Sequence, residues 1–112
     1  TWNKHNREQA LRFGVEVVEW ADFTPATVPI PTGPLYVTID LDALDPAFAP
    51  GVSHPEPGGL SVRDIVAVIA RIRTQVVGAD VVELNPAHDT GDATAIVAVK
   101  LIKELMGAMA RR

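Results

Sequence analysis

The stretch Tyr36–Gly59 reads YVTIDLDALDPAFAPGVSHPEPGG, and the rest of the chain is arranged around it. Its first residues belong to a nearly continuous apolar run from Leu35 to Ile39, a pattern typical of a strand covered on both faces. Asp40 and Asp42 follow at a spacing of two, so on an extended chain their side chains would point to the same side. Because ligands of open α/β sheets bind beyond the carboxyl ends of the strands, this pair is the first candidate site.

Two carboxylates at the end of a buried strand repel each other and lose solvation, and a cation relieves both effects. Oxygen ligands in a chain without Cys favour Mg²⁺ or Mn²⁺. A pair of such ions about 3.5–4 Å apart can activate a water molecule. The alternatives are a solvated strand-to-loop junction, or Asp side chains that cap the turn at Asp45-Pro46.

Upstream, the pattern predicts a helix over Asn3–Phe13 that stops at Gly14, and a less buried strand over Val15–Trp20. A Pro-rich loop, Ala21–Pro34, leads to the central strand Leu35–Asp40. Downstream, residues 43–60 contain four prolines and no periodic pattern, which predicts a stiff, shaped wall. This wall carries a lone His, His54, which is either a structural hydrogen-bond partner or a ligand.

A helix is predicted to begin at Ser61. A second buried strand is predicted over Val76–Glu83, so the central unit is expected to be β-α-β with parallel strands. Asp89 and Asp92 suit the N-terminus of a final helix, Ala93–Ala110. The carboxyl ends of parallel strands lie side by side, so the carboxylate at residue 83 should open onto the same crevice as the Asp pair. There it could be a ligand, a general base or a clamp for a guanidinium group, or it could pair with a local cation or amide.

Composition bounds the function. The 112 residues are enough for one domain, and 47% apolar residues indicate a globular chain. A net charge of −4 without a basic stripe gives no support for a nucleic-acid partner. No signal peptide or membrane-spanning run is present, and we expect a cytoplasmic protein. The chain has no initiator Met and opens in a predicted helix, so we expect a piece of a longer protein.

One family matches these residues. Asp40-Leu-Asp42-Ala-Leu-Asp45-Pro46 with Gly58-Gly59-Leu60 resembles the C-terminal signature of the ureohydrolases, the arginase and agmatinase family. Val82–Pro86 is similar to that family's Glu-x-Asn-Pro element. Three further segments resemble the branch of plant arginases and many bacterial agmatinases: Arg12–Glu16, Gly51–His54 and Gly78–Glu83.

The resemblance implies a three-layer α/β/α fold with a mainly parallel sheet, and Mn²⁺-dependent hydrolysis of a guanidino group to urea and an amine. It implies that Asp40 and Asp42 act in catalysis as ligands of two manganese ions, with Asp40 bridging them. Glu83 would bind the substrate's guanidinium, and His54 would lie near the substrate. Resemblance to that branch slightly favours agmatine over arginine as the substrate, and a formiminoglutamase-type enzyme is an alternative. The full-length protein is expected to be a homo-oligomer, either a trimer or a hexamer.

The family's other metal ligands, a His after Gly-Gly-Asp and an Asp-x-His-x-Asp group, do not occur in this sequence, and His5 and His88 lie in no such motif. We therefore expect residues 1–112 to be a single partial domain, the last third of a ureohydrolase, inactive alone. Two other classes stay open. One is a haloacid-dehalogenase-like phosphohydrolase, suggested by Asp-x-Asp and Gly91-Asp92 but disfavoured by Leu44. The other is a non-catalytic metal-binding or assembly module.

Overall fold

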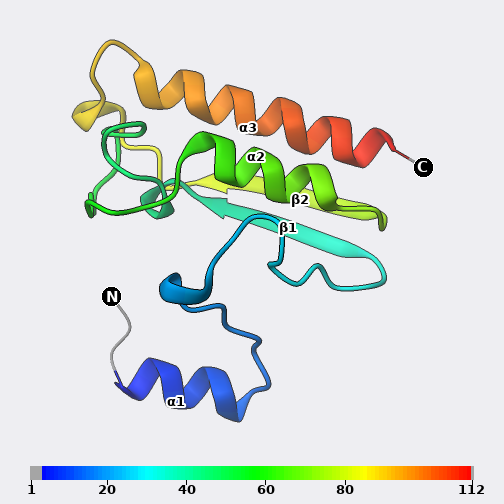
Figure 1. Cartoon of the computed structure of the whole chain (residues 1–112). Helices are drawn as coiled ribbons and strands as arrows, with labels where there is room; N and C mark the ends of the chain where they lie inside the picture. Colours follow the sequence, from blue (N-terminus) through cyan, green and yellow to red (C-terminus); the bar gives the residue numbers. More distant parts are fainter. Residues whose placement is uncertain (1–3, 112) are drawn as a thin grey trace.

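A computed structural model describes residues 4–111 of the chain. Its centre is a two-stranded parallel sheet of β1 (Leu35–Asp40) and β2 (Val76–Val82), joined by the crossover helix α2 (Val62–Arg71) (Figure 1). The last helix, α3, spans Ala93–Ala110. The β-α-β unit and the bounds of the final helix are therefore confirmed.

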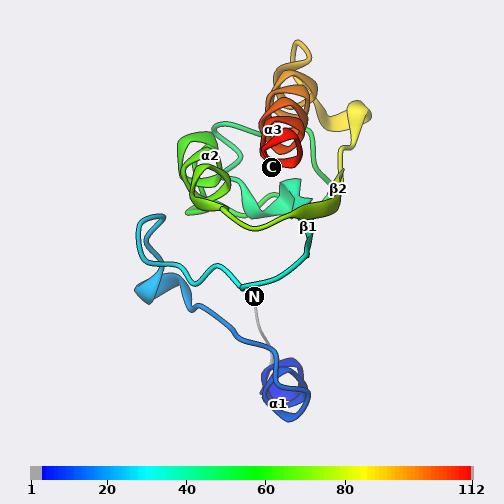
Figure 2. The same cartoon turned by 90° about the vertical axis from the view of Figure 1, so that its right-hand side faces the viewer.

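Helix α2 begins where the sequence predicted. Ser61 and Asp64 form a capping box, in which Ser61 Oγ accepts from the backbone N–H of Asp64 over 3.1 Å and Asp64 Oδ2 accepts from that of Ser61 over 2.9 Å. Figures 1 and 2 show α2 and α3 together on one face of the sheet. Residues buried between these layers include Ile39, Leu41, Leu44, Val52, Ile65, Ile69, Leu101 and Leu105.

The other face of the sheet is open in the described residues. Burial alternates along β1, and Tyr36 is 63% exposed. The prediction that this strand is covered on both faces is therefore wrong for residues 4–111, because every second residue of β1 faces away from the core and is exposed. Helix α1 (Lys4–Arg12) lies on the open side but away from the sheet (Figure 2).

Gly14 ends α1 as predicted. Its φ is 69°, and the N–H of Val15 reaches back to the carbonyl of Ala10 over 2.9 Å, a Schellman-type stop. The strand predicted over Val15–Trp20 does not form, because a strand needs a hydrogen-bonded neighbour and this segment pairs with neither β1 nor β2. A short 3-10 helix, Trp20–Asp22, follows it. Across residues 4–111, no helix combines the length and apolarity needed to cross a bilayer.

Candidate active site

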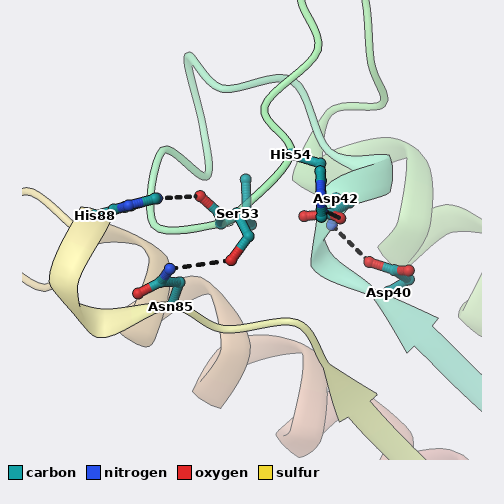
Figure 3. A network of polar contacts seen from close by, with 7 residues as sticks. Asp40, Asp42, Ser53, His54, Asn85 and His88 are labelled. Atoms are coloured by element: carbon teal, nitrogen blue, oxygen red, sulfur yellow. Dashed lines mark hydrogen bonds and ion pairs between the residues drawn. The ribbon is translucent and has the colours of Figure 1, made fainter.

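The structure keeps Asp40 and Asp42 at the carboxyl end of β1, but not on an extended chain. Residues Leu41–Ala43 form a 3-10 turn, and Asp40 caps its N-terminus. Asp40 Oδ1 accepts a hydrogen bond from the backbone N–H of Asp42 over 2.8 Å (Figure 3). The predicted extended chain between Asp40 and Asp42 is therefore wrong, because the Asp40 side chain closes a local turn instead. Both carboxylates nevertheless lie at the predicted edge of the sheet.

Asp42 carries a buried polar atom without a partner. Its Oδ1 accepts no hydrogen bond within residues 4–111, and its Oδ2 lies 3.4 Å from His54 Nδ1 (Figure 3). A buried carboxylate oxygen without a donor is costly, and a divalent cation would remove that cost. Asp40 and Asp42 therefore fit an oxygen-preferring ion such as Mn²⁺. In the described part of the chain no three His, Cys, Asp or Glu side chains are arranged to hold an ion, so this ligand set is incomplete.

Glu83 is the first residue beyond β2 at the same edge. Asp40 pairs in register with Val82 across the parallel strands, which brings the backbone of Glu83 to the level where the 3-10 turn begins. Its φ of 70° is a left-handed conformation that costs a non-glycine residue about 1–3 kcal/mol. Such strain is concentrated at functional sites. The contact of Glu83 with a substrate stays a prediction.

The loop after the 3-10 turn is closed by Asp45. Its Oδ1 accepts from the backbone N–H of Ala47 over 2.8 Å, and its Oδ2 from that of Gly58 over 2.7 Å. These bonds hold the pKa of Asp45 below its ordinary value. A Cβ at Gly59 would lie 2.6 Å from the Asp45 backbone nitrogen, so the chain requires glycine there. The sequence left open whether an Asp side chain caps the turn at Asp45-Pro46, and the structure shows that Asp45 does so.

Sequence reasoning missed two residues that hold the loop from the other side of the site. Asn85 Nδ2 donates to Ser53 Oγ over 3.0 Å, and His88 Nδ1 lies 2.8 Å from the Val52 carbonyl oxygen (Figure 3). Asn85-Pro86 was recognised as part of a family element but was given no role in holding the loop, and His88 lies in no motif. The Asx turn that Asn-Pro favours was the one available signal for a bend here.

An open cleft of about 720 Å³ lies beside Asp42. Two more carboxylate residues, Glu19 and Glu56, line it, and the described lining residues include no Lys or Arg. Trp20 and Phe23 form an aromatic wall, with stacked rings whose centroids are 6.2 Å apart. Nothing in the sequence indicated this cleft, because the wall forms only when residues 18–23 fold against the loop around residue 58.

Comparison with known proteins places the chain in a family. The sequence model of the arginase family matches residues 5–107. Arginase 1, mitochondrial, of Arabidopsis thaliana is 49% identical over 97% of this chain and 34% of its own length. Agmatinase of Halalkalibacterium halodurans is 45% identical over 64% of this chain and 26% of its own length.

A solved structure agrees with these sequence matches. The arginase from Medicago truncatula matches with a TM-score of 0.87 at 43% identity, over 97% of this chain and 37% of that one. The arginase-like α/β fold predicted from the sequence is therefore confirmed. The chain spans about a third of the length of the curated relatives it matches. From the family match, the identities and the shared fold, we conclude that this chain belongs to the arginase family.

Proposed function

We propose that residues 1–112 are the C-terminal part of the catalytic domain of an Mn²⁺-dependent amidinohydrolase, which releases urea from a small guanidino substrate. One observation carries this proposal: a buried oxygen of Asp42 without a hydrogen-bond partner, at the carboxyl end of β1. Relatives named arginase and agmatinase support a guanidino compound as the substrate.

Each site residue has a role in the proposal. Asp40 and Asp42 would hold Mn²⁺, with two ions in the complete enzyme and Asp40 shared between them. When bound, the ions would supply an activated water for attack on the guanidino carbon. Glu83 would accept two parallel hydrogen bonds from the guanidinium, which fixes its orientation. His54, beside Asp42, would contact the substrate from the loop. The remaining ligands would come from other parts of the full-length protein.

The cleft beside Asp42 supports a substrate with a positively charged far end. Glu56 and Glu19 add carboxylates to its walls, although Arg7 already pairs with Glu19 over 2.8 Å. The ring of Trp20, 62% exposed, can bind a cation over its face. Agmatine, which ends in an ammonium, should therefore be preferred to arginine, which adds a carboxylate. 4-Guanidinobutyrate and formiminoglutamate, which carry only carboxylates at the far end, should be worse.

Three other assignments belong to this proposal. The full-length protein would be a homo-oligomer, a trimer or hexamer, and it would act in the cytoplasm, although the plant relatives carry mitochondrial names. Membership of the arginase family argues against the phosphohydrolase alternative. A non-catalytic assembly module is the remaining rival, and metal binding with turnover separates it from an enzyme.

Alanine substitutions of the two aspartates test the proposed metal site. Asp40→Ala and Asp42→Ala in the full-length protein should each lower the Mn²⁺ content and abolish urea release, because each removes a ligand. Asp22→Ala, which removes an exposed carboxylate from the 3-10 helix Trp20–Asp22, is the control and should change neither. Metal analysis beside the urea assay is the measurement. Full Mn²⁺ occupancy and turnover in both site variants would rule out the ligand assignment.

A further inference from the structure

Each residue of the loop segment Gly51–Ser53 makes a polar contact with the part of the chain that follows β2. Gly51 N–H donates to the buried Thr94 Oγ1 over 2.7 Å, and the Gly51 carbonyl accepts from Asn85 N–H over 2.8 Å. The Val52 carbonyl then meets His88 Nδ1, and Ser53 Oγ accepts from the Asn85 side chain (Figure 3). We call these four contacts the loop tether. They end one residue before His54.

Beyond the tether the loop has little else to hold it. Within residues 4–111, the next hydrogen bond to its backbone is the one that Gly58 N–H gives to Asp45. His54 itself is 83% exposed along its side chain, and its 3.4 Å approach to Asp42 is too long to fix it. The place of His54 beside Asp42 therefore depends on the tether.

His88 donates one of the tether contacts from its side chain, and no sequence motif accounts for this residue. A carbonyl oxygen can only accept, so Nδ1 of His88 must carry the proton. The ring is carried by a short 3-10 helix, Pro86–His88, which Asn85 caps by accepting from Ala87 N–H over 3.1 Å. Because the Asn85 oxygen is used in that cap, its amide nitrogen is the end that faces Ser53. The orientations of both side chains are thus fixed by their partners.

We infer that His88 is a positioning residue: through the Val52 carbonyl it holds the loop that presents His54 beside Asp42. His88 acts at a distance, since it contacts the backbone two residues before His54 and makes no hydrogen bond to Asp40 or Asp42 within residues 4–111. The inference rests on the proposed function only where it concerns substrate binding by His54. Its structural part, the anchoring of the loop, can be measured without any activity.

Two substitutions separate the proton donor from the ring. His88→Asn keeps a nitrogen donor at the position of Nδ1, whereas His88→Phe keeps the ring and loses the donor. In the full-length Mn²⁺-loaded protein, His88→Phe should raise amide hydrogen exchange at Gly51 and Val52, whose N–H groups are hydrogen-bonded, about five- to tenfold, the factor expected for one lost hydrogen bond. His88→Asn should restore exchange to near the wild-type rate. His5→Phe, the same change on the exposed surface of α1, is the matched control and should leave the loop unaffected.

Kinetics test the link to His54. His88→Phe should raise KM for the guanidino substrate several-fold with little change in kcat, whereas a general loss of folded protein would lower kcat and leave KM unchanged. In a His54→Ala background the same substitution should have no further effect on KM, because the group it positions is gone. Unchanged loop exchange in His88→Phe, or equal effects of the Phe and Asn variants, would overturn the inference. A wild-type protein that releases no urea, while loop exchange responds as stated, would overturn the proposed function and leave the positioning role in place.

Discussion

Asp45 stabilises the loop beside the candidate site as an ionised carboxylate. Hydrogen bonds from the backbone N–H groups of Ala47 and Gly58 favour its charged form and lower its pKa. A carboxyl whose pKa is depressed by folding adds stability above its unfolded pKa, about 3.9, and loses that contribution as the pH falls through its folded pKa. Closure of this loop should therefore weaken in acid.

Asp45→Asn tests this linkage. The variant should unfold at a lower temperature than the wild type at pH 7, because the amide cannot replace both charge-assisted bonds. The difference should begin to shrink as the pH drops below the unfolded pKa of about 3.9, and it should vanish once the pH has fallen through the lower pKa of the folded carboxyl. Thermal unfolding of both proteins between pH 2 and 7 is the measurement, with Asp22→Asn, which removes an exposed carboxylate outside the loop, as the control. A difference that persists unchanged at pH 2 would contradict the account.

Glu83→Gln probes the proposed guanidinium contact without removing a proposed ligand. Loss of a charge-assisted hydrogen bond costs about 1.5–3 kcal/mol, which corresponds to a rise in KM of roughly 10- to 150-fold. The Mn²⁺ content should be unchanged. Steady-state kinetics and metal analysis on the same preparation decide the matter, and a loss of metal would mean that Glu83 is itself a ligand.

The sequence predicted which residues gather at this edge better than it predicted their conformation. Asp40, Asp42 and Glu83 all lie where the parallel strands end. The 3-10 turn was not foreseen, because one hydrogen bond from the Asp42 N–H to the Asp40 side chain decides between turn and extended chain. His88 was not foreseen either, since its partner is a backbone carbonyl 36 residues away, which leaves no trace in the local pattern.

At the level of elements, the register of β1 against β2 determines how close the Asp40–Asp42 pair lies to Glu83. The register shifts between Leu35 and Tyr36, a local irregularity of the bulge type. Beyond it, Asp80 accepts from the Tyr36 hydroxyl over 2.8 Å and from Thr38 Oγ1 over 2.5 Å. A Cβ at Gly78 would lie 2.7 Å from the Tyr36 ring, so the ring rests directly on the neighbouring strand. These contacts hold the register that aligns the two strand ends.

Asp80→Asn should loosen this cross-strand pairing. The hydrogen bond to Asp80, and then its negative charge, raise the pKa of Tyr36, so the substitution should lower that pKa toward its ordinary value. Tyr36 is the only tyrosine of the 112-residue chain, so alkaline titration of tyrosinate absorbance in this chain reports on it alone. Asp64→Asn, in the capping box of α2, is the control that should weaken the fold and leave the tyrosine unchanged. An unaltered titration in Asp80→Asn would show that the contact does not form in solution.

Helix ends set by neighbouring residues were predicted, and so was the parallel pairing of β1 with β2, but one predicted strand did not form. The cap at Ser61, the stop at Gly14 and the span of α3 follow from neighbouring residues, and the structure confirms all three. Val15–Trp20 has the residues of a strand but no strand beside it in the described chain, and β-propensity alone cannot supply a hydrogen-bonded neighbour.

At the scale of the whole molecule, residues 4–111 expose apolar surface that a stable monomer would cover. Tyr36 and Val77 are exposed on the sheet at 63% and 55%. Helix α3 exposes a row of large apolar side chains, namely Ile96, Val99, Ile102, Met106 and Met109. Both edges of the two-stranded sheet are unpaired within the described residues. Open edges and apolar patches of this kind promote association.

The isolated 112-residue chain should therefore self-associate, bind Mn²⁺ weakly and release no urea. Two carboxylates compete poorly with the hydration shell of the ion. Sedimentation gives the oligomeric state and calorimetric titration gives the Mn²⁺ affinity. A monomer that binds two Mn²⁺ tightly and releases urea would show that these residues form a complete enzyme.

Product identification with the full-length protein tells whether the enzyme releases urea from a guanidino compound. With Mn²⁺ present, agmatine, arginine, 4-guanidinobutyrate and formiminoglutamate are offered separately, and urea and formamide are both assayed. Urea should be the product, and activity should fall from agmatine to arginine to 4-guanidinobutyrate, because carboxylates line the cleft. Formamide from formiminoglutamate as the sole product, with no urea from any guanidino compound, would contradict this prediction.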